Sequence, residues 1–216
     1  MKKQLITTID HIVFGAYSLD QGVDFIYQKL GVIPHHGGKH PLMGTHNKLL
    51  KLGRSIYLEI IAIDPDAPKP NRPRWFHLDD LQPDARPKLL TWVVRSNDIH
   101  EAVSRSGLKH GTIESLQRGV YKWYITVPSD GAMPLQGIAP TIIQWKGIQH
   151  PAKDLQDSLV SLIDIEAFHP DAFALNHSLT AIGYHGQFLA DPIASNSRSL
   201  LRVTLKGPNG PAIFES

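Results

Sequence analysis

The sequence predicts an α+β protein in which two β-α-β-β-β modules form a curved, mainly antiparallel half-barrel sheet with helices outside, followed by a partial third module. Strand-like runs and helical stretches occur twice in the same order, a Pro-rich segment separates the two copies, and a shorter copy ends the chain. The modules span residues 1–64 and 89–147, with the linker at 65–88. The C-terminal unit, residues 148–216, is expected to pack on the same body.

The first expected strand, about residues 8–14, carries one histidine among apolar residues. Side chains on a strand alternate between its faces, so His11 should share a face with Ile9 and Val13, while Asp10 takes the other face. We therefore expect the His11 side chain to point toward an enclosed space.

The rest of the first module has one well-marked helix. Ser18 is a good N-cap and Gly31 a good C-terminal stop, which predicts a helix over residues 19–30. Residues 34–41 have turn composition and predict a flexible loop. Two strands joined by a tight turn are expected at about 48–52 and 55–63.

The linker contains six prolines, which exclude a regular helix or central strand across most of it. We expect it to wrap on the surface. Trp75 and Phe76 are too apolar to stay exposed, so they should dock on the body or at the mouth of a pocket.

The second module repeats the order of the first. Asn97 is the expected N-cap of its helix, which ends before Gly107, and its strands are expected at about 89–95, 111–115, 121–127 and 141–145. Alignment of the two helix starts places His11 over Thr91, and alignment of the last strands places Glu59 over Gln144. Trp92, Trp123 and Trp145 lie on these strands and are expected in the core.

The C-terminal unit reads as a cut-down β-α-β-β-β pattern. An apolar run at 159–168 is followed by a helix from Pro170-Asp171 to about Ile182, and by short strands at about 187–190, 200–206 and 212–214. In this pattern Asp164 takes the place of His11.

Composition narrows the class of partner. Apolar residues make up 42% of the chain and charged residues 19%, as in ordinary globular proteins, and the net charge of +2 is too small for a nucleic-acid or membrane surface. There is no cysteine and no run of about 18 apolar residues. We expect a cytoplasmic protein, monomeric or homodimeric, whose partner is a small molecule.

Glu59 is the carboxylate that most needs an explanation. It lies within an otherwise apolar strand, and Glu is rarely buried unless it is paired or coordinates a metal. Either an ion pair with His11 between neighbouring strands or a shared metal site accounts for both residues.

Several stretches give the chain a family resemblance. It resembles the vicinal oxygen chelate superfamily, which includes glyoxalase I, extradiol dioxygenases and bleomycin- and fosfomycin-resistance proteins, and it is most similar to the glyoxalase-like branch. The residues that carry the resemblance are Ile9-Asp10-His11-Ile12-Val13, His40-Pro41-Leu42-Met43-Gly44-Thr45-His46-Asn47, Tyr57-Leu58-Glu59, Arg74-Trp75-Phe76-His77-Leu78-Asp79, Pro140-Thr141-Ile142-Ile143-Gln144-Trp145 and His150-Pro151.

The resemblance implies a metal site built from the first and last strands of each module. Carried over by position, the ligands are His11 and Glu59, then Thr91 and Gln144, of which the last two are weak or neutral donors. The expected cofactor is therefore either one divalent ion (Zn, Mn, Fe or Ni) or none. The implied function is a metal-dependent lyase, isomerase or dioxygenase, and the alternative is a metal-free binding or sequestering protein of the bleomycin-resistance type.

These expectations give a set of candidate site residues. The segment 34–47 is expected to act as a lid whose polar side chains meet the ligand. The metal candidates are His11 and Glu59, the catalytic candidates Glu59 and His40, and the ligand-binding candidates His46, Asn47, Trp75, Thr91 and Gln144.

Overall fold

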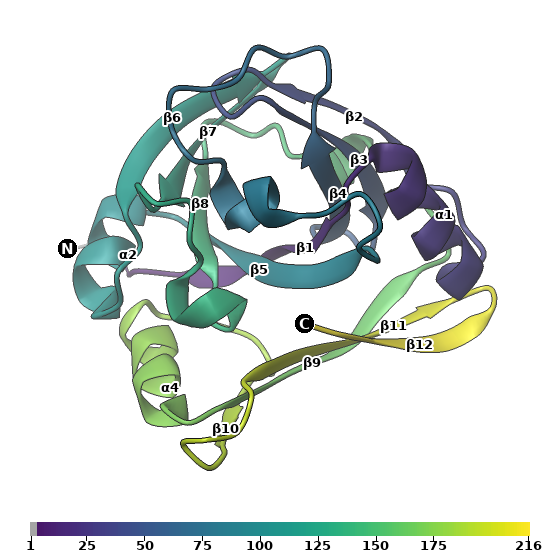
Figure 1. Cartoon of the computed structure of the whole chain (residues 1–216). Helices are drawn as coiled ribbons and strands as arrows, with labels where there is room; N and C mark the ends of the chain where they lie inside the picture. The colour runs from purple at the N-terminus through teal and green to yellow at the C-terminus, as the bar shows by residue number, and fades with distance from the viewer. Residues whose placement is uncertain (1–3) are drawn as a thin grey trace.

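In the computed structural model, which describes residues 4–216, the chain forms an eight-stranded sheet and a separate four-stranded sheet (Figure 1). The large sheet has the order β2-β3-β4-β1-β5-β8-β7-β6, and the small one the order β10-β9-β11-β12. The large sheet curls around the middle of the molecule with α1 and α2 outside it, so the predicted α+β half-barrel is confirmed (Figure 1).

The first module comprises β1 (Thr7–Gly15), α1 (Leu19–Leu30), β2 (His35–His40), β3 (Thr45–Lys51) and β4 (Tyr57–Ile63). The second comprises β5 (Lys88–Ser96), α2 (Ile99–Ser106), β6 (Thr112–Arg118), β7 (Tyr121–Val127) and β8 (Thr141–Trp145). The C-terminal unit comprises α3 (Pro151–Asp154), β9 (Ser161–His169), α4 (Ala172–Ala181), β10 (Ala190–Pro192), β11 (Leu200–Gly207) and β12 (Gly210–Glu215).

Two local expectations in the modules are corrected by hydrogen bonds. The stretch predicted as a flexible loop is mostly strand β2, because His35 to His40 pair with β3 along its edge. The N-cap of α2 is Asp98, whose side chain accepts from the Glu101 amide, and not Asn97. Asn97 instead accepts a hydrogen bond from the Ile6 amide and so ties the helix start to the chain before β1.

The strand register decides which residues of the two modules are equivalent. At the centre of the sheet β1 runs antiparallel to β5, and each pairs in parallel with the last strand of its own module. Val13 pairs with Glu59, and Val93, the counterpart of Val13, pairs with Thr141. The counterpart of Glu59 is therefore Thr141, and the sequence alignment with Gln144 is wrong.

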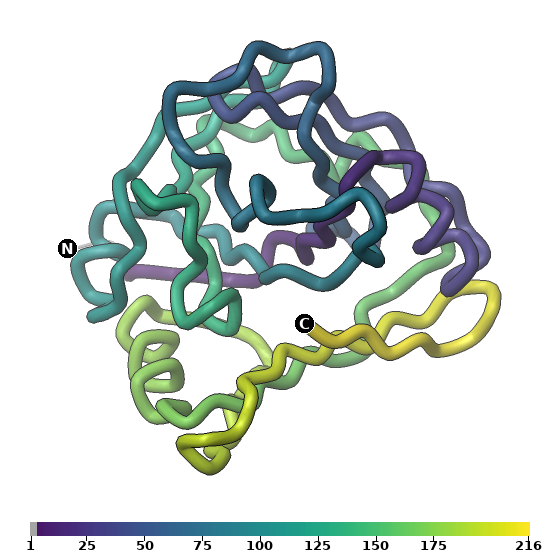
Figure 2. Tube along the Cα trace, in the orientation of Figure 1, coloured from purple at the N-terminus to yellow at the C-terminus, as the bar shows by residue number. Residues whose placement is uncertain are grey.

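The two edges of the large sheet approach each other, so the half-barrel is nearly closed. Strands β2 and β6 stand at opposite ends of the hydrogen-bonding order but lie against one another, which we call the seam (Figure 2). Arg118 on β6 crosses the seam, and its Nη1 donates to Asn47 Oδ1 on β3 at 2.9 Å.

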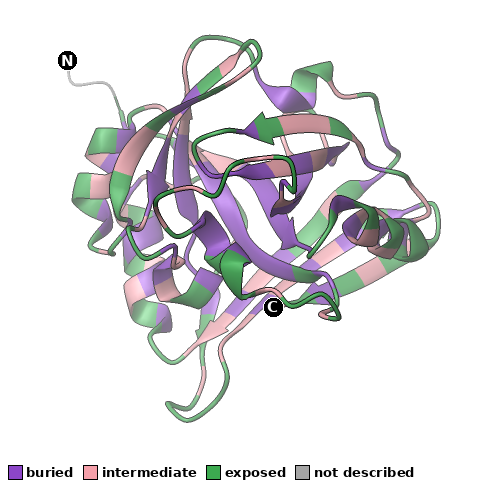
Figure 3. Ribbon diagram, turned by 45° about the horizontal axis from the view of Figure 1, so that its top comes forward, coloured by how far each residue is buried: buried purple, intermediate pink, exposed green. Residues whose placement is uncertain are grey.

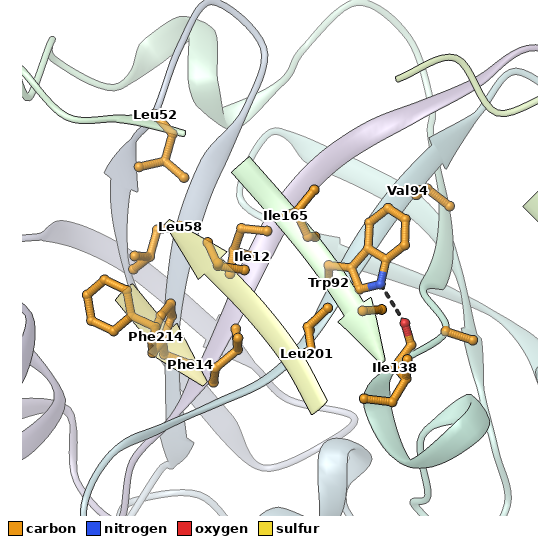
Figure 4. Packing of buried hydrophobic residues seen from close by; sticks show 14 of the residues in the cluster. Ile12, Phe14, Leu52, Leu58, Trp92, Val94, Ile138, Ile165, Leu201 and Phe214 are labelled. Atoms are coloured by element: carbon orange, nitrogen blue, oxygen red, sulfur yellow. Dashed lines mark hydrogen bonds between the residues drawn. The ribbon is translucent and has the colours of Figure 1, made fainter. Parts of the chain in front are cut away.

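The main apolar core lies on the outer face of the large sheet, between it and the small sheet. Ile12, Phe14 and Trp92 from the large sheet pack against Leu201 and Phe214 from the small one (Figure 4). The Trp92 indole donates to the Ile138 carbonyl at 2.8 Å, which satisfies its only polar atom. The central strands are accordingly buried, and exposed residues gather on helices and outer loops (Figure 3).

The C-terminal unit has the predicted order of elements but pairs them differently. In the first two modules the first strand runs parallel to the last, whereas β9 runs parallel to β10, which directly follows α4. Asp164, the counterpart expected for His11, is exposed on the small sheet, where it pairs with Thr204. The small sheet of this unit covers the half-barrel from outside.

The Pro-rich linker crosses the open end of the half-barrel. Its short helical segment η1 (Trp75–Asp80) lies within the ring of strands (Figure 2). Trp75, Phe76 and Leu78 of η1 are buried and join a second apolar cluster with Val13 and Ile61 of the inner face. Among residues 4–216, no helix has the length and apolar character needed to span a membrane.

Candidate functional site

A small cavity lies inside the half-barrel, under the η1 segment. Its free space is about 20 Å³, room for about one water molecule. Four polar or charged side chains (His11, His40, Glu59 and Arg118), five aromatic side chains (Tyr57, Trp75, Phe76, Trp123 and Trp145) and two isoleucines (Ile125 and Ile143) line it. Any organic ligand must therefore enlarge the cavity, and η1 is the wall that carries no strand pairing.

A β-bulge in β1 brings two neighbouring residues to this side of the sheet. Ile9 and His11 pair with consecutive residues of β5, so Asp10 is the extra residue between them. Ile9 consequently packs in the outer core and not beside His11, which corrects the expected alternation. The Asp10 carboxylate reaches the His11 ring, and Oδ1 accepts from Nδ1 at 2.7 Å.

His11 lies between two carboxylates. Its Nδ1 faces Asp10, and its Nε2 faces Glu59 Oε2 on the neighbouring strand β4 at 3.4 Å. The imidazole is also stacked on the Tyr57 ring, with 4.5 Å between centroids and 16° between planes. The ion pair considered from the sequence is therefore present, and it is buried at the wall of the cavity.

The charges of this cluster follow from competition between burial and hydrogen bonding. Burial alone would lower the pKa of His11, but the hydrogen bonds to Asp10 and Glu59 outweigh it and raise that pKa to about 9. Burial alone would raise the pKa of Glu59, and the hydrogen bond with His11 outweighs it and lowers that pKa to about 2. The pKa of Asp10 is likewise held below its ordinary range, against burial, by His11 and His150. An imidazolium thus lies between two carboxylates.

Asn47 forms a hydrogen bond with Oε1, the carboxylate oxygen of Glu59 that does not face His11. Its Oδ1 accepts from Arg118 Nη1 and from the Gly38 amide, both at 2.9 Å, and these groups can only donate. The orientation of the Asn47 amide is therefore determined, and its Nδ2 donates to Glu59 Oε1. Glu59 Oε2 is left for His11.

The same partners determine the protonation of His40. Its Nε2 lies 3.4 Å from Asn47 Nδ2 and from Arg118 Nη1, both donors, so Nε2 must carry the lone pair. Its Nδ1 then donates to Thr45 Oγ1 at 3.1 Å. Burial, aided by the nearby Arg118, lowers the pKa of His40 to about 4 despite the Glu59 charge. His40 therefore presents a neutral acceptor nitrogen to the site.

A residue of the C-terminal unit completes the cluster. His150 caps α3, where its Nδ1 accepts from the Ala152 amide, so the proton is on Nε2, which donates to Asp10 Oδ2 at 2.9 Å. The Trp145 indole donates to the same oxygen at 2.9 Å. A continuous polar chain, which we call the relay, runs across the cavity wall through His150, Asp10, His11, Glu59, Asn47 and Arg118.

The structure brings some of the predicted site residues together and separates others. His40 and Asn47 lie in the site, but they are buried on strands and do not belong to a mobile lid. Trp75 lines the cavity, as do Trp123 and Trp145. Trp123 also belongs to the inner apolar cluster, as the sequence predicts, and Trp145 is partly buried against it. Thr91 faces inward but is fully buried, and its hydroxyl donates to the Trp92 carbonyl at 3.3 Å.

Two candidates lie on the outer face of the sheet. His46 pairs with Ala62 of the outer core, and its ring is 3.9 Å from Asp64. Gln144 accepts from the Ile99 amide at the start of α2 at 2.7 Å, which turns it away from the cavity. The inward positions of β8 are instead Ile143 and Trp145.

Sequence reasoning did not assign a site role to Asp10, Tyr57, Arg118 or His150. Asp10 was placed on the wrong face because a bulge leaves no clear sequence signal. Tyr57 and His150 lie in stretches that carry the family resemblance, which was the available signal for them. Arg118 had none, because only closure of the seam brings it to Asn47, 71 positions away.

The donor set does not fit a resident divalent ion. His11 and Glu59 are two strong donors, but their counterparts in the second module are Thr91 and Thr141, and the Arg118 cation stands in the same wall. The lone pair of His40 Nε2 faces the donors of Asn47 and Arg118. Among the residues that the structure describes, no group of three or more His, Asp or Glu side chains is arranged to hold a metal ion.

Comparison with known proteins gives one family match and several similar structures. A family model described as a glyoxalase-like domain matches residues 9–183. A hypothetical protein from Staphylococcus aureus is 16% identical with a TM-score of 0.56, over 97% of this chain and 85% of that one, so the shared fold extends over the C-terminal unit. No curated protein matches the sequence.

Two further structures cover less of the chain. Methylmalonyl-CoA epimerase from Mycobacterium tuberculosis is 16% identical over 65% of this chain and 88% of that one, with a TM-score of 0.43. A hypothetical protein from Bacillus halodurans C-125 is 14% identical over 66% of this chain and 96% of that one, also with a TM-score of 0.43.

Proposed function

Because the chain belongs to the glyoxalase-like domain family of the vicinal oxygen chelate superfamily, we propose that it binds a small oxygen-bearing molecule in the cavity of the half-barrel, without a resident metal ion. The observation that carries the proposal is the relay at the wall of an aromatic cavity. Burying an imidazolium and two carboxylates gives little net stability, since desolvation offsets their attraction. A ligand that uses these groups is a better reason for their presence.

The metal-dependent alternative is less well supported by the donor set. A lyase, isomerase or dioxygenase that relies on a divalent ion would need donors beyond His11 and Glu59, and Thr91 and Thr141 are poor substitutes. His11 also uses both ring nitrogens toward carboxylates, with a pKa that keeps both protonated near neutral pH. We therefore propose that no metal step is needed for binding.

Proton transfer is a second candidate function, favoured by the gap between His11 and Glu59. Their 3.4 Å separation is longer than a normal hydrogen bond, and both groups border the cavity. With a pKa of about 2, Glu59 is a weak base in the free protein. A ligand oxygen that accepts the hydrogen bond of His11 Nε2 would remove the contact with Glu59 that lowers this pKa, so the pKa of Glu59 would rise in the complex.

In that reaction Glu59 would accept a proton from a carbon next to a ligand carbonyl, and the His11 imidazolium would stabilise the resulting oxyanion. His40 is a neutral acceptor, and we propose that it accepts a hydrogen bond from a ligand hydroxyl. Asn47 is proposed to hold Glu59 in place. Trp75 is proposed as an apolar contact. Since one chain supplies all the residues that line the cavity, a monomer is sufficient for binding, and a homodimer is also compatible with it. We propose a cytoplasmic location.

Binding and metal content test the main proposal together. Protein purified without chelator should contain no stoichiometric metal, and adding Zn²⁺, Mn²⁺, Fe²⁺ or Ni²⁺ should leave its melting temperature unchanged. A library of small carbonyl compounds and carboxylic acids should quench fluorescence of the cavity tryptophans, and Trp75→Phe should reduce the signal. One metal ion per chain that is lost in His11→Ala and Glu59→Ala would contradict the metal-free proposal.

Isotope exchange tests the second candidate. A bound carbonyl compound should take up deuterium from D₂O at the carbon next to the carbonyl, and Glu59→Gln should abolish the uptake while binding persists. Equal uptake with Glu59→Gln would remove Glu59 as the base.

A further inference from the structure

We infer that the ligand of the cavity is a monoanion whose carboxylate, or comparable oxyanion, binds the Arg118 guanidinium at the seam, with a compact apolar body between the aromatic walls. This inference rests on the proposed small-molecule function and names its ligand class. It depends on the unmatched charge of Arg118, on the charge count around the cavity, and on the chemistry of the walls.

Among the buried and half-buried arginines of residues 4–216, Arg118 alone has no acidic partner. Arg72 and Arg74 form ion pairs with Glu114 and Asp79, at 2.9 and 2.6 Å. Within residues 4–216, no carboxylate lies within 4 Å of the Arg118 guanidinium, although that guanidinium forms part of a buried polar cluster. An arginine in such a position is suited to bind a carboxylate in a bidentate way.

The geometry at the seam leaves donors of Arg118 available. Nη1 is used by Asn47, and the guanidinium lies 5.6 Å from the Tyr121 ring centroid. Over the described part of the chain, Nε and Nη2 donate to no protein atom. Gly38 on β2 makes the crossing possible, because a Cβ there would lie 2.5 Å from Arg118 Cδ.

The charges around the cavity leave one positive charge in excess. Of the charged side chains that line the cavity, Glu59 is negative and His11 and Arg118 are positive. Asp10 and Arg95 do not line it, and they lie 3.6 Å apart and offset each other. His40 and His150 each use one ring nitrogen as an acceptor and are neutral in this arrangement. One negative charge on the ligand balances the site.

The charges beside the aromatic walls argue against a cationic ligand. Aromatic rings can hold a cation, and Trp75, Trp123 and Trp145 would suit one by shape alone. The excess positive charge beside those rings repels a cation, however, and the relay carboxylates are already occupied by His11. Trp75 adds a donor, since its buried Nε1 has no hydrogen-bond partner among the described residues.

Matched acid and amide probes measure the contribution of charge at constant shape. Benzoate against benzamide, and acetate against acetamide, are titrated by calorimetry and tryptophan fluorescence into wild type, Arg118→Gln, Arg118→Lys and the control Arg105→Gln. Arg105 is an exposed helix residue paired with Glu101 and lies outside the site. Benzylammonium serves as the cationic probe.

In wild type and in Arg105→Gln we expect benzoate to bind at least about ten-fold more tightly than benzamide, the effect of one charge-assisted contact. Arg118→Gln should bring the ratio to about one without changing benzamide affinity, and Arg118→Lys should keep part of the preference. Melting curves confirm that each variant is folded, and the Lys variant keeps the test valid should the Gln variant unfold.

The remaining outcomes separate this inference from the proposed function. Equal binding of acid and amide, tighter binding of benzylammonium, or an acid preference that survives Arg118→Gln would overturn the anion assignment and leave small-molecule binding intact. Binding of none of the probes to wild type would overturn the anion assignment together with the cavity as a binding site for compact organic molecules.

Discussion

Replacing Glu59 by alanine should destabilise the protein strongly. The change leaves the His11 imidazolium and the Asn47 amide without their acceptor in a buried site, and removing one partner of a buried ion pair costs about 3–5 kcal/mol. The pKa gives a second route to the magnitude. Lowering it from 4.5 to about 2, at about 1.4 kcal/mol per pKa unit, corresponds to about 3 kcal/mol.

Urea unfolding at pH 7 measures this free energy, and Glu114→Ala is the matched control. Glu114 also pairs with an arginine, but its side chain is 29% exposed, so its loss should cost no more than about 1 kcal/mol. Glu59→Gln keeps the shape and should fall between the two. A Glu59→Ala protein as stable as Glu114→Ala, or more stable than wild type, would refute the reasoning that the carboxylate is held by its partners.

Three other changes test separate parts of the site. Because the native state raises the pKa of His11 from 6.5 to about 9, the free energy of unfolding should fall by about 3 kcal/mol as pH rises from 6.5 to 9, and urea titrations of His11→Asn should lack this loss. Thr91→Val should change stability by less than about 1.5 kcal/mol and leave probe binding unchanged, since the hydroxyl contacts only a backbone carbonyl. Gly38→Ala should push Arg118 off Asn47 and weaken benzoate binding, while the melting temperature shifts by only a few degrees; unchanged benzoate affinity would contradict this seam geometry.

The sequence predicted the ends of helices and strands correctly where capping or turn residues bound them. Helix α1 has the predicted ends because Ser18 caps it and Gly31 adopts the left-handed conformation at φ 75°. Strands β7 and β8 also match, since turn residues bound both of them. Strand β2 was missed because its glycines and histidines have low strand propensity, and pairing with β3 overrides that preference.

The sequence predicted the His11–Glu59 pair of the site but did not identify the residues at the two ends of the relay. His11 and Glu59 could be found because a buried ionisable residue in an apolar strand requires a partner. Arg118 could not, because Asn47 lies 71 positions away and no local pattern encodes that contact. His150 lies 140 positions from Asp10, and only the family resemblance of its stretch marked it. The assignments of Gln144 and Asp10 failed for a different reason, since a three-residue change of register and one bulge each altered the side of the sheet that a side chain faces.

The seam also bears on the order in which the molecule forms. Hairpins such as β3–β4 and β6–β7 join neighbours in sequence, whereas the contact between Arg118 and Asn47 requires both modules to be in place. Contacts made late in folding slow unfolding more than they speed folding. An anion bound between Arg118 and the opposite wall would therefore lower the unfolding rate of the protein more than it raises the folding rate. The lifetime of the folded state would lengthen accordingly.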